Sequence, residues 1–261
     1  MKTALITGAS SGFGKEFAKI FAKDGYNLVI AARSTDKLEK LKSFIEMEYG
    51  VDVFVFTKDL SQPSAPQEIF DFTQQKGITV DVLVNNAGVG DLGKFTDSDL
   101  SRQQQMIDLN VSALVKLTHL YLPAMLDKAD GKILNVASIA GFAPGPGMSV
   151  YYASKAFVLS FSDALSTELK GTGVTVTALC PGPVNTGFAA AAGFKNSVLF
   201  SGKEDGKAAQ VSRYGYNAMK KGKAIALPDL MCKGAAFAVR LVPRSVPKAF
   251  IHAVQSSRVD K

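Results

Sequence analysis

The sequence predicts an α/β fold, a doubly wound parallel sheet of about seven strands with helices on both faces. Short, continuous apolar runs alternate along the chain with longer segments whose apolar residues recur at helical spacing. Such alternation is typical of a parallel sheet covered by helices. A glycine cluster also follows the first apolar run directly, where a strand would turn into a helix.

Each predicted strand is a short, predominantly apolar run, and a continuous apolar run is typical of a strand that is buried on both faces. Leu28–Ala32 is the clearest example. The predicted strands are the run that ends at Leu5–Thr7, then 28–32, 51–56, 80–84, 132–136 and 174–179, with 224–227 as a candidate seventh.

The predicted helices fill the intervals between these strands. Phe17, Ile20 and Phe21 share one face of a helix over 15–24. Further helical patterns are Leu38, Leu41, Phe44 and Ile45, then residues 101–125, and then residues 151–170. Residues 187–222 are rich in Ala, Gly and Lys, and we expect them to leave the sheet as a lid over the substrate site.

The composition is that of one globular domain, which we expect to span residues 1–261. Hydrophobic residues make up 47% of the chain and charged residues 20%, values that exclude a disordered, collagenous or coiled-coil protein. No apolar run approaches the roughly 20 residues of a membrane helix, and the apolar stretch at the start is too short for a signal peptide. Two cysteines indicate a reducing compartment, so we expect a cytoplasmic protein without a metal site.

The glycine cluster has the spacing G-x-x-x-G-x-G, with glycines at positions 8, 12 and 14. Glycines at such a turn let the backbone approach a pyrophosphate, whose charge meets the amides of a helix N-terminus. An ordinary strand-to-helix turn also uses Gly and Ser. The position of the cluster, at the first strand of a doubly wound pattern, favours a dinucleotide site.

Five further motifs follow in order: Asn85-Asn86-Ala87-Gly88, Asn110, Ser138, the Y-x-x-x-K pair Tyr151 and Lys155, and Pro181-Gly182. With the glycine loop they resemble the short-chain dehydrogenase/reductase family over residues 1 to about 190. The resemblance implies a Rossmann-type fold and a nicotinamide-dependent oxidoreductase that interconverts a carbonyl and an alcohol.

The resemblance also implies the catalytic roles. Ser138 orients the carbonyl and Tyr151 donates the proton, while Asn110 belongs to a proton relay that reaches Lys155. A free tyrosine, with a pKa near 10, is a poor proton donor near neutrality, and a neighbouring lysine should lower that pKa. Tyr152 leaves the wrong spacing to Lys155, so we expect Tyr151 to be the acid.

Cofactor choice depends on the end of the second strand, where an acidic residue would favour NAD(H). Arg33 stands there instead, and its planar cation suits a 2′-phosphate. The sequence therefore favours NADP(H). By resemblance, the cofactor contacts are Gly8, Ser10, Ser11, Gly12, Phe13, Gly14, Arg33, Asp59, Leu60, Asn86, Ala87, Gly88, Tyr151, Lys155, Pro181, Gly182, Val184 and Thr186.

The substrate is expected to be a small carbonyl compound or alcohol. Phe142, Met148 and Phe188, with Phe194, Leu199 and Phe200, offer an apolar wall that suits a lipophilic ketone, aldehyde, steroid or acyl group. The same side chains equally suit packing on one another. Two rival functions use the same fold: a non-enzymatic NADP(H)-binding regulator, and a dehydratase or epimerase.

The charge is concentrated in the last part of the chain. Residues 201–261 carry 12 Lys and Arg against 4 Asp and Glu, a surplus of +8 in a chain of net charge +7. A neutral body with a basic tail does not suggest a nucleic-acid-binding protein. Within residues 229–261, Asp229 should cap one helix and Pro247 should open another, with Leu230, Phe237 and Leu241 at helical spacing.

Cations beside these apolar residues suit contact with an anionic membrane. The alternative, slightly favoured because the tail lacks tryptophan, is that the apolar stripe folds over the substrate cleft or a neighbouring subunit. By resemblance, residues 101–125 and 151–170 would pair with their copies in a homodimer or homotetramer. Leu114, Leu117, Phe157 and Phe161 are the candidate contacts.

Overall fold

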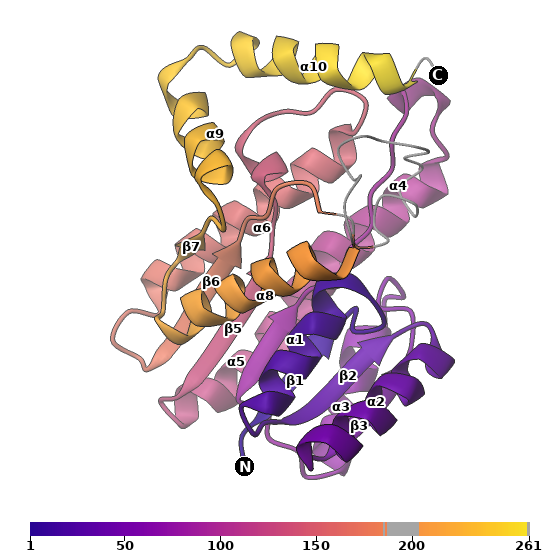
Figure 1. The fold of residues 1–261 in the computed structure, drawn as a ribbon, viewed down its shortest axis with the longest axis vertical. Helices are drawn as coiled ribbons and strands as arrows, with labels where there is room; N and C mark the ends of the chain where they lie inside the picture. Colours follow the sequence, from indigo (N-terminus) through magenta and orange to yellow (C-terminus); the bar gives the residue numbers. More distant parts are fainter. Residues whose placement is uncertain (185, 187–203, 260–261) are drawn as a thin grey trace.

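A seven-stranded parallel sheet forms the centre of the molecule, as the sequence predicts (Figure 1). The computed structural model describes residues 1–184, 186 and 204–259. The strands stand in the order β3-β2-β1-β4-β5-β6-β7. Their bounds are β1 Thr3–Thr7, β2 Asn27–Ala32, β3 Val53–Thr57, β4 Val82–Asn85, β5 Gly131–Val136, β6 Val174–Leu179 and β7 Ile225–Ala226.

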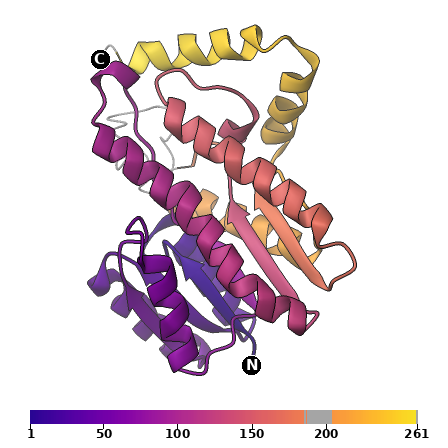
Figure 2. The same cartoon turned by 180° about the vertical axis from the view of Figure 1, so that it is seen from behind.

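The strand order reverses between β1 and β4, which opens a crevice at their carboxyl ends where such folds bind ligands. Helices cover both faces of the sheet (Figures 1 and 2). Side chains of α1, α2 and α8 pack on one face, and those of α3, α5 and α6 on the other. These helices span Gly12–Lys23, Thr35–Tyr49, Glu204–Lys220, Ala65–Gln75, Ala113–Asp127 and Ser149–Glu168 in that order.

The position of helix α8 shows that the lid expected over residues 187–222 is wrong for residues 204–220. Its residues Val211, Tyr216 and Met219 are buried against α1 and the sheet. Tyr216 also donates a hydrogen bond to Asp24 at the end of α1. Residues 204–220 therefore belong to the body of the fold, whereas 187–203 lie outside the described residues.

The long helix expected over 101–125 is divided. It consists of α4 Leu100–Ile107, one π-helical turn η2 Asp108–Ser112, and α5. By length and composition the whole run, Leu100–Asp127, would be long and apolar enough to cross a membrane. Leu117, Tyr121 and Met125 are buried against the sheet and α3, so core packing explains the apolar composition.

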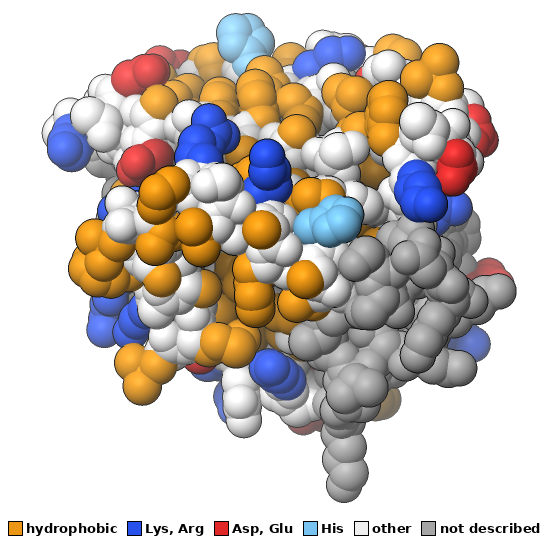
Figure 3. Space-filling view, turned by 90° about the horizontal axis from the view of Figure 1, so that it is seen from above, with side chains coloured by type: hydrophobic (Ala, Val, Ile, Leu, Met, Phe, Trp, Pro, Cys, Tyr) orange, Lys and Arg blue, Asp and Glu red, His pale blue; other side chains and the backbone are white. Residues whose placement is uncertain are grey.

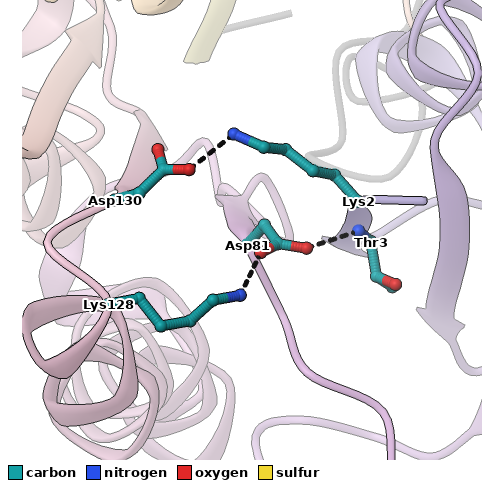
Figure 4. Close-up of polar contacts among 5 residues, drawn as sticks. All are labelled: Lys2, Thr3, Asp81, Lys128 and Asp130. Carbon is teal, nitrogen blue, oxygen red and sulfur yellow. Dashed lines mark hydrogen bonds and ion pairs between the residues drawn. The ribbon is translucent and has the colours of Figure 1, made fainter.

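A polar cluster joins the amino ends of three strands (Figure 4). The buried carboxylate of Asp81 accepts a hydrogen bond from the Thr3 amide at 2.8 Å and one from Lys128 Nζ at 2.6 Å. Beside it, Lys2 and Asp130 form an exposed ion pair at 2.6 Å. These contacts hold β1, β4 and the start of β5 in place at the end of the sheet away from the crevice.

The C-terminal segment forms two helices over the opposite end of the molecule, α9 Leu230–Leu241 and α10 Ser245–Val259 (Figure 1). Asp229 caps α9 as predicted, since its carboxylate accepts a hydrogen bond from the Cys232 amide at 2.7 Å. Pro247 lies in the first turn of α10, as expected. Smaller elements are the 3₁₀ turns η1 Phe95–Asp97 and η3 Ile139–Phe142.

Candidate active site

A cleft of about 390 Å³ lies at the carboxyl ends of the strands. It contains the glycine loop after β1, the ends of β2 and β3, the N-N-A-G segment after β4, and the tyrosine and lysine of α6. Motifs that lie far apart in the sequence therefore meet in one place, as expected for loops at the switch point of a doubly wound sheet.

The glycine loop packs so tightly that side chains are excluded from it. A Cβ at Gly8 would lie 2.8 Å from Asn86 Nδ2, and a Cβ at Gly14 would lie 2.3 Å from the Gly8 carbonyl oxygen. Gly8 and Gly12 also have φ values of +67° and +52°, which glycine adopts without strain. The backbone between them borders the open cleft, so its amides are available to an anion at the start of α1.

Asn86 fixes this loop to the end of β4. Its Nδ2 donates to the carbonyl oxygens of Thr7 and Gly8, at 2.8 and 3.2 Å. In return, Thr7 Oγ1 accepts hydrogen bonds from the amides of Asn86 and Ala87, at 2.9 and 3.0 Å. The two bonds from Nδ2 make the Asn86 side chain a structural part of the cleft wall, and Ala87 and Gly88 line the cleft beside it.

Ser138 and Tyr151 lie together at the centre of the cleft. Ser138 follows β5 and caps η3, where its Oγ accepts a hydrogen bond from the Ala140 amide at 3.1 Å. The side chains of Ser138 and Tyr151 are hydrogen-bonded to each other. Burial raises the pKa of Tyr151 to about 12, partly offset by the bond from Ser138. This direction is opposite to the lowering expected from Lys155.

The position of Lys155 explains the difference. Its Nζ lies 5.9 Å from the centre of the Tyr151 ring and donates a hydrogen bond to the Val136 carbonyl oxygen at 2.8 Å. Burial lowers the pKa of Lys155 to about 8. Desolvation is therefore the largest cause of the pKa shift at both residues. It favours a neutral Tyr151 phenol and makes the Lys155 ammonium group easier to deprotonate.

Asn110 is the buried residue of the π-helical turn η2. Its Oδ1 accepts from the Val89 amide and its Nδ2 donates to the Val89 carbonyl oxygen, both at 2.9 Å. A further bond at 3.1 Å reaches Ser154. Asn110 thus clamps the segment after β4 to α6, next to Gly88 and Lys155, and its part in a proton relay stays a prediction.

Basic residues surround the end of the cleft beside β2 and β3. Arg33 is well exposed and lies 3.8 Å from Asp59, and Lys58 also borders the cleft there. Ser10 and Ser11 border it from the glycine loop.

The structure brings most of the expected site residues together. Ser138, Met148, Tyr151 and Lys155 line the cleft, as do all the expected cofactor contacts except Gly14, which packs beneath the loop. Phe142 is not among the lining residues and packs, partly buried, against an apolar cluster that includes Leu114 and Val158, so its contact with the substrate stays a prediction. Phe188, with Phe194, Leu199 and Phe200, lies outside the described residues.

Sequence reasoning missed several cleft residues, among them the hydrogen-bonded pair Tyr152 and Gln255. Tyr152, set aside because of its spacing to Lys155, lines the cleft next to Tyr151. Gln255 reaches it from α10, and its Nε2 donates a hydrogen bond to the Tyr152 hydroxyl at 3.1 Å. A helical pattern in the tail predicts that residue 255 shares a face with Ile251, but no local signal says where that face docks.

Comparison with known proteins agrees with this geometry. The chain is 40% identical to sulfoacetaldehyde reductase 2 of Chromohalobacter salexigens over 186 residues, which cover 70% of this chain and 73% of that protein. It is 36% identical to the very-long-chain 3-oxoacyl-CoA reductase of Anas platyrhynchos over 191 residues, covering 68% of this chain and 58% of the other.

A short-chain dehydrogenase from Sphingobium yanoikuyae in complex with NADPH has a similar structure. Its TM-score is 0.81 at 30% identity, and the match covers 93% of this chain and 96% of that one. The short chain dehydrogenase family profile matches residues 2–196, which include the glycine loop, Ser138, Tyr151 and Lys155. The chain therefore belongs to the short-chain dehydrogenase family of oxidoreductases.

Proposed function

We propose that the protein is an NADP(H)-dependent oxidoreductase that reduces a carbonyl group to an alcohol, or catalyses the reverse reaction, with Tyr151 as the acid and base. One observation carries the proposal. The hydrogen-bonded pair of Ser138 and Tyr151, with Lys155 beside it, lies in the same cleft as the glycine loop.

The cleft fits a dinucleotide. The glycine positions where a Cβ would collide with the neighbouring backbone leave a smooth wall for a pyrophosphate at the N-terminus of α1. Ala87, Gly88, Pro181 and Gly182 line the same cleft as this wall and Tyr151. A bound NADP(H) would supply or accept the hydride there.

The residues of the chain handle the proton and the oxygen. A neutral Tyr151 hydroxyl carries the proton that a reduced carbonyl oxygen must receive. Ser138 offers a second hydroxyl to the same oxygen, which holds it in line and stabilises its developing charge. The charged form of Lys155 would stabilise the phenolate left behind, because opposite charges attract strongly in a buried site.

NADP(H) is proposed over NAD(H) because no acidic side chain ends β2. Arg33 and Lys58 both border that end of the cleft, and two cations suit a 2′-phosphate better than a neutral ribose.

The substrate is proposed to be a lipophilic ketone, aldehyde, steroid or acyl compound. Ile139, Ala140, Met148 and Pro181 give the substrate end of the cleft an apolar wall. The 3-oxoacyl-CoA reductase supports an acyl substrate and the sulfoacetaldehyde reductase supports a small aldehyde.

The test is a screen for NADPH oxidation with aldehydes, steroid ketones and 3-oxoacyl derivatives. Oxidation of one NADPH for each alcohol formed supports the proposal. Tight NADPH binding with no turnover of any class would instead support a regulatory protein. Conversion of a substrate without net NADPH consumption would support a dehydratase or epimerase.

A further inference from the structure

Helix α9 exposes an apolar stripe to solvent. Leu230, Phe237 and Leu241 are 84%, 64% and 69% exposed. Their spacing of seven and then four residues places them on one face of the helix. The buried residues Cys232 and Ala236 lie on the other side, against the body of the protein. Leu230, Phe237 and Leu241 are not among the described residues that line the cleft.

Helix α10 continues this exposed surface. Val246 and Phe250 are 51% and 69% exposed, whereas Pro247 and Gln255 are buried beneath them. We call Leu230, Phe237, Leu241, Val246 and Phe250 the α9–α10 surface. Exposed side chains this large rarely gather on a soluble monomer unless the surface binds something.

The two helices of the α9–α10 surface carry side-chain charge of one sign, although Asp229 stands directly before Leu230. Residues 230–259 contain five Lys and Arg and no Asp or Glu. Lys233, Arg240, Arg244 and Lys248 are all exposed. Figure 3 looks down on this end of the molecule and shows hydrophobic side chains with Lys and Arg between them.

We propose that the α9–α10 surface binds anionic lipid bilayers reversibly. Apolar side chains enter the interface between headgroups and acyl chains, and each nearby cation adds about 1 kcal/mol of attraction to an anionic leaflet. A second copy of the chain is a poorer occupant. A symmetric contact would bring the same cations of both copies together with no acidic partner on either helix.

The experiment is co-sedimentation of the full chain with vesicles of phosphatidylcholine, alone and mixed with phosphatidylserine. We expect pelleting only with the mixed vesicles, weakened by added salt. The apolar variant Leu241→Ser/Phe250→Ser and the charge variant Arg240→Glu/Arg244→Glu should each reduce pelleting at least tenfold. The matched control Lys37→Glu/Lys40→Glu changes exposed cations on α2 and should pellet like the original chain.

Equal, negligible pelleting with both kinds of vesicle would overturn the proposal. Equal pelleting of the α9–α10 variants and the control would also overturn it. Light scattering of the same variants tests whether a second copy of the chain occupies the surface instead of a bilayer. A fall in mass of Leu241→Ser/Phe250→Ser without vesicles would assign the surface to a second copy instead.

An independent observation inside the cleft concerns Gln255. Its side chain is 5% exposed, and its Nε2 is bonded to the Tyr152 hydroxyl. Its Oε1 is buried and has no hydrogen-bond partner within the described part of the chain. A buried acceptor without a partner costs about 1–3 kcal/mol. Gln255 lines the cleft, so a molecule bound there is a source of the missing donor.

We infer that Gln255 Oε1 accepts a hydrogen bond from a hydroxyl or N–H group on the substrate, away from the reacting carbonyl. This inference rests on the proposed function. Tyr152 holds the amide in place, and the Tyr151 and Tyr152 rings are 6.1 Å apart, so the acceptor lies near the reaction centre. A fixed acceptor repels an anionic group, which favours a neutral hydroxy-carbonyl compound over an aldehyde that carries a sulfonate.

The test compares NADPH-dependent reduction of 4-hydroxycyclohexanone and 4-methylcyclohexanone, which have similar shapes. We expect kcat/KM to favour the hydroxyl compound about tenfold, the worth of one buried hydrogen bond. Gln255→Met should abolish that preference by lowering kcat/KM for the hydroxyl compound about tenfold more than for the methyl compound. Gln255→Glu keeps an acceptor and should preserve the preference.

An equal loss of activity on both ketones in Gln255→Met would show a purely structural role and overturn the inference. An unchanged ratio between the ketones would overturn it as well. Both results leave the proposed function standing, since the original chain still oxidises NADPH. No oxidation with either ketone in the original chain would count against the proposed function itself.

Discussion

Desolvation controls the two residues on which the chemistry depends. Burial raises the pKa of Tyr151 to about 12 and lowers that of Lys155 to about 8. At neutral pH the phenol keeps its proton, while the lysine remains charged at a cost to folding. Functional sites commonly hold such destabilised groups. The buried charge of Lys155 should therefore lower the stability of the fold while it serves the reaction.

Lys155→Met should abolish turnover and raise the free energy of unfolding at pH 7. A pKa of about 8, lowered from 10.5, means that burying the charged form costs about 3 kcal/mol. Because the folded state loses this proton before the unfolded state does, the cost falls as pH rises from about 8 toward 10.5. The gain in the free energy of unfolding from Lys155→Met should therefore shrink as the pH rises from about 8 toward 10.5. Urea unfolding at pH 7 and pH 10 measures it, and a variant less stable at pH 7 would contradict the account.

Arg33 should control cofactor preference. Ala32→Asp combined with Arg33→Ala replaces a cation with a carboxylate at the end of β2. We expect the ratio of kcat/KM for NADPH over NADH to fall by at least tenfold, because the carboxylate repels a 2′-phosphate and accepts hydrogen bonds from a 2′-hydroxyl. Lys223→Ala, an exposed change beyond α8, is a control. An unchanged ratio in the double variant would remove Arg33 from the cofactor site.

At the scale of elements, the two carboxylates of the polar cluster at the amino ends of the strands should contribute unequally to the free energy of unfolding. Asp81→Ala removes a buried acceptor and leaves the Thr3 amide and Lys128 without their shared partner. We expect a loss of about 2–3 kcal/mol in the free energy of unfolding. Asp130→Ala breaks only an exposed ion pair and should cost at most about 1 kcal/mol. Chemical denaturation measures the free energy of unfolding of both variants. Equal losses in Asp81→Ala and Asp130→Ala would contradict this ranking.

The elements also show what the sequence can predict. The strands are short, mostly apolar runs, so all seven are visible in the sequence. The glycine, N-N-A-G, Ser138 and Pro181-Gly182 motifs locate the cleft because each follows a strand. Helix α8 escapes notice because its segment is rich in Ala, Gly and Lys, although Val211, Tyr216 and Met219 share its buried face. Gln255 escapes because its role depends on where α10 docks, which no local pattern encodes. The tyrosine pKa was wrong in direction because burial, unlike a neighbouring lysine, cannot be read from spacing.

At the scale of the whole molecule, the exposed residues revise the expected oligomer contacts. Leu114 and Leu117 are core residues at 6% and 1% exposure and cannot contribute. Phe157 is 42% exposed and stacks on Phe161, with the ring centres 5.9 Å apart. This pair on α6, with the half-exposed Ile107 of α4, leaves a smaller but continuous basis for pairing through the same helices.

We expect a homodimer or homotetramer that Phe157→Glu dissociates, because a charge buried in an apolar contact is costly. Light scattering at micromolar concentration measures the mass. Phe95→Glu, which changes another exposed phenylalanine on η1, is the matched control and should leave the mass unchanged. A 27.7 kDa species in the original chain would contradict the prediction.

The most direct test of the proposed function is the Tyr151→Phe variant, which removes one hydroxyl from the buried ring. NADPH binding, followed by fluorescence titration, should stay within about threefold of the original chain, because the glycine loop, Asn86 and Lys155 are untouched. Turnover of any carbonyl substrate found in the NADPH screen should fall by at least a thousandfold, because the proton donor is lost. Retention of more than a few per cent of the activity, with binding intact, would show that another group donates the proton and would contradict the account.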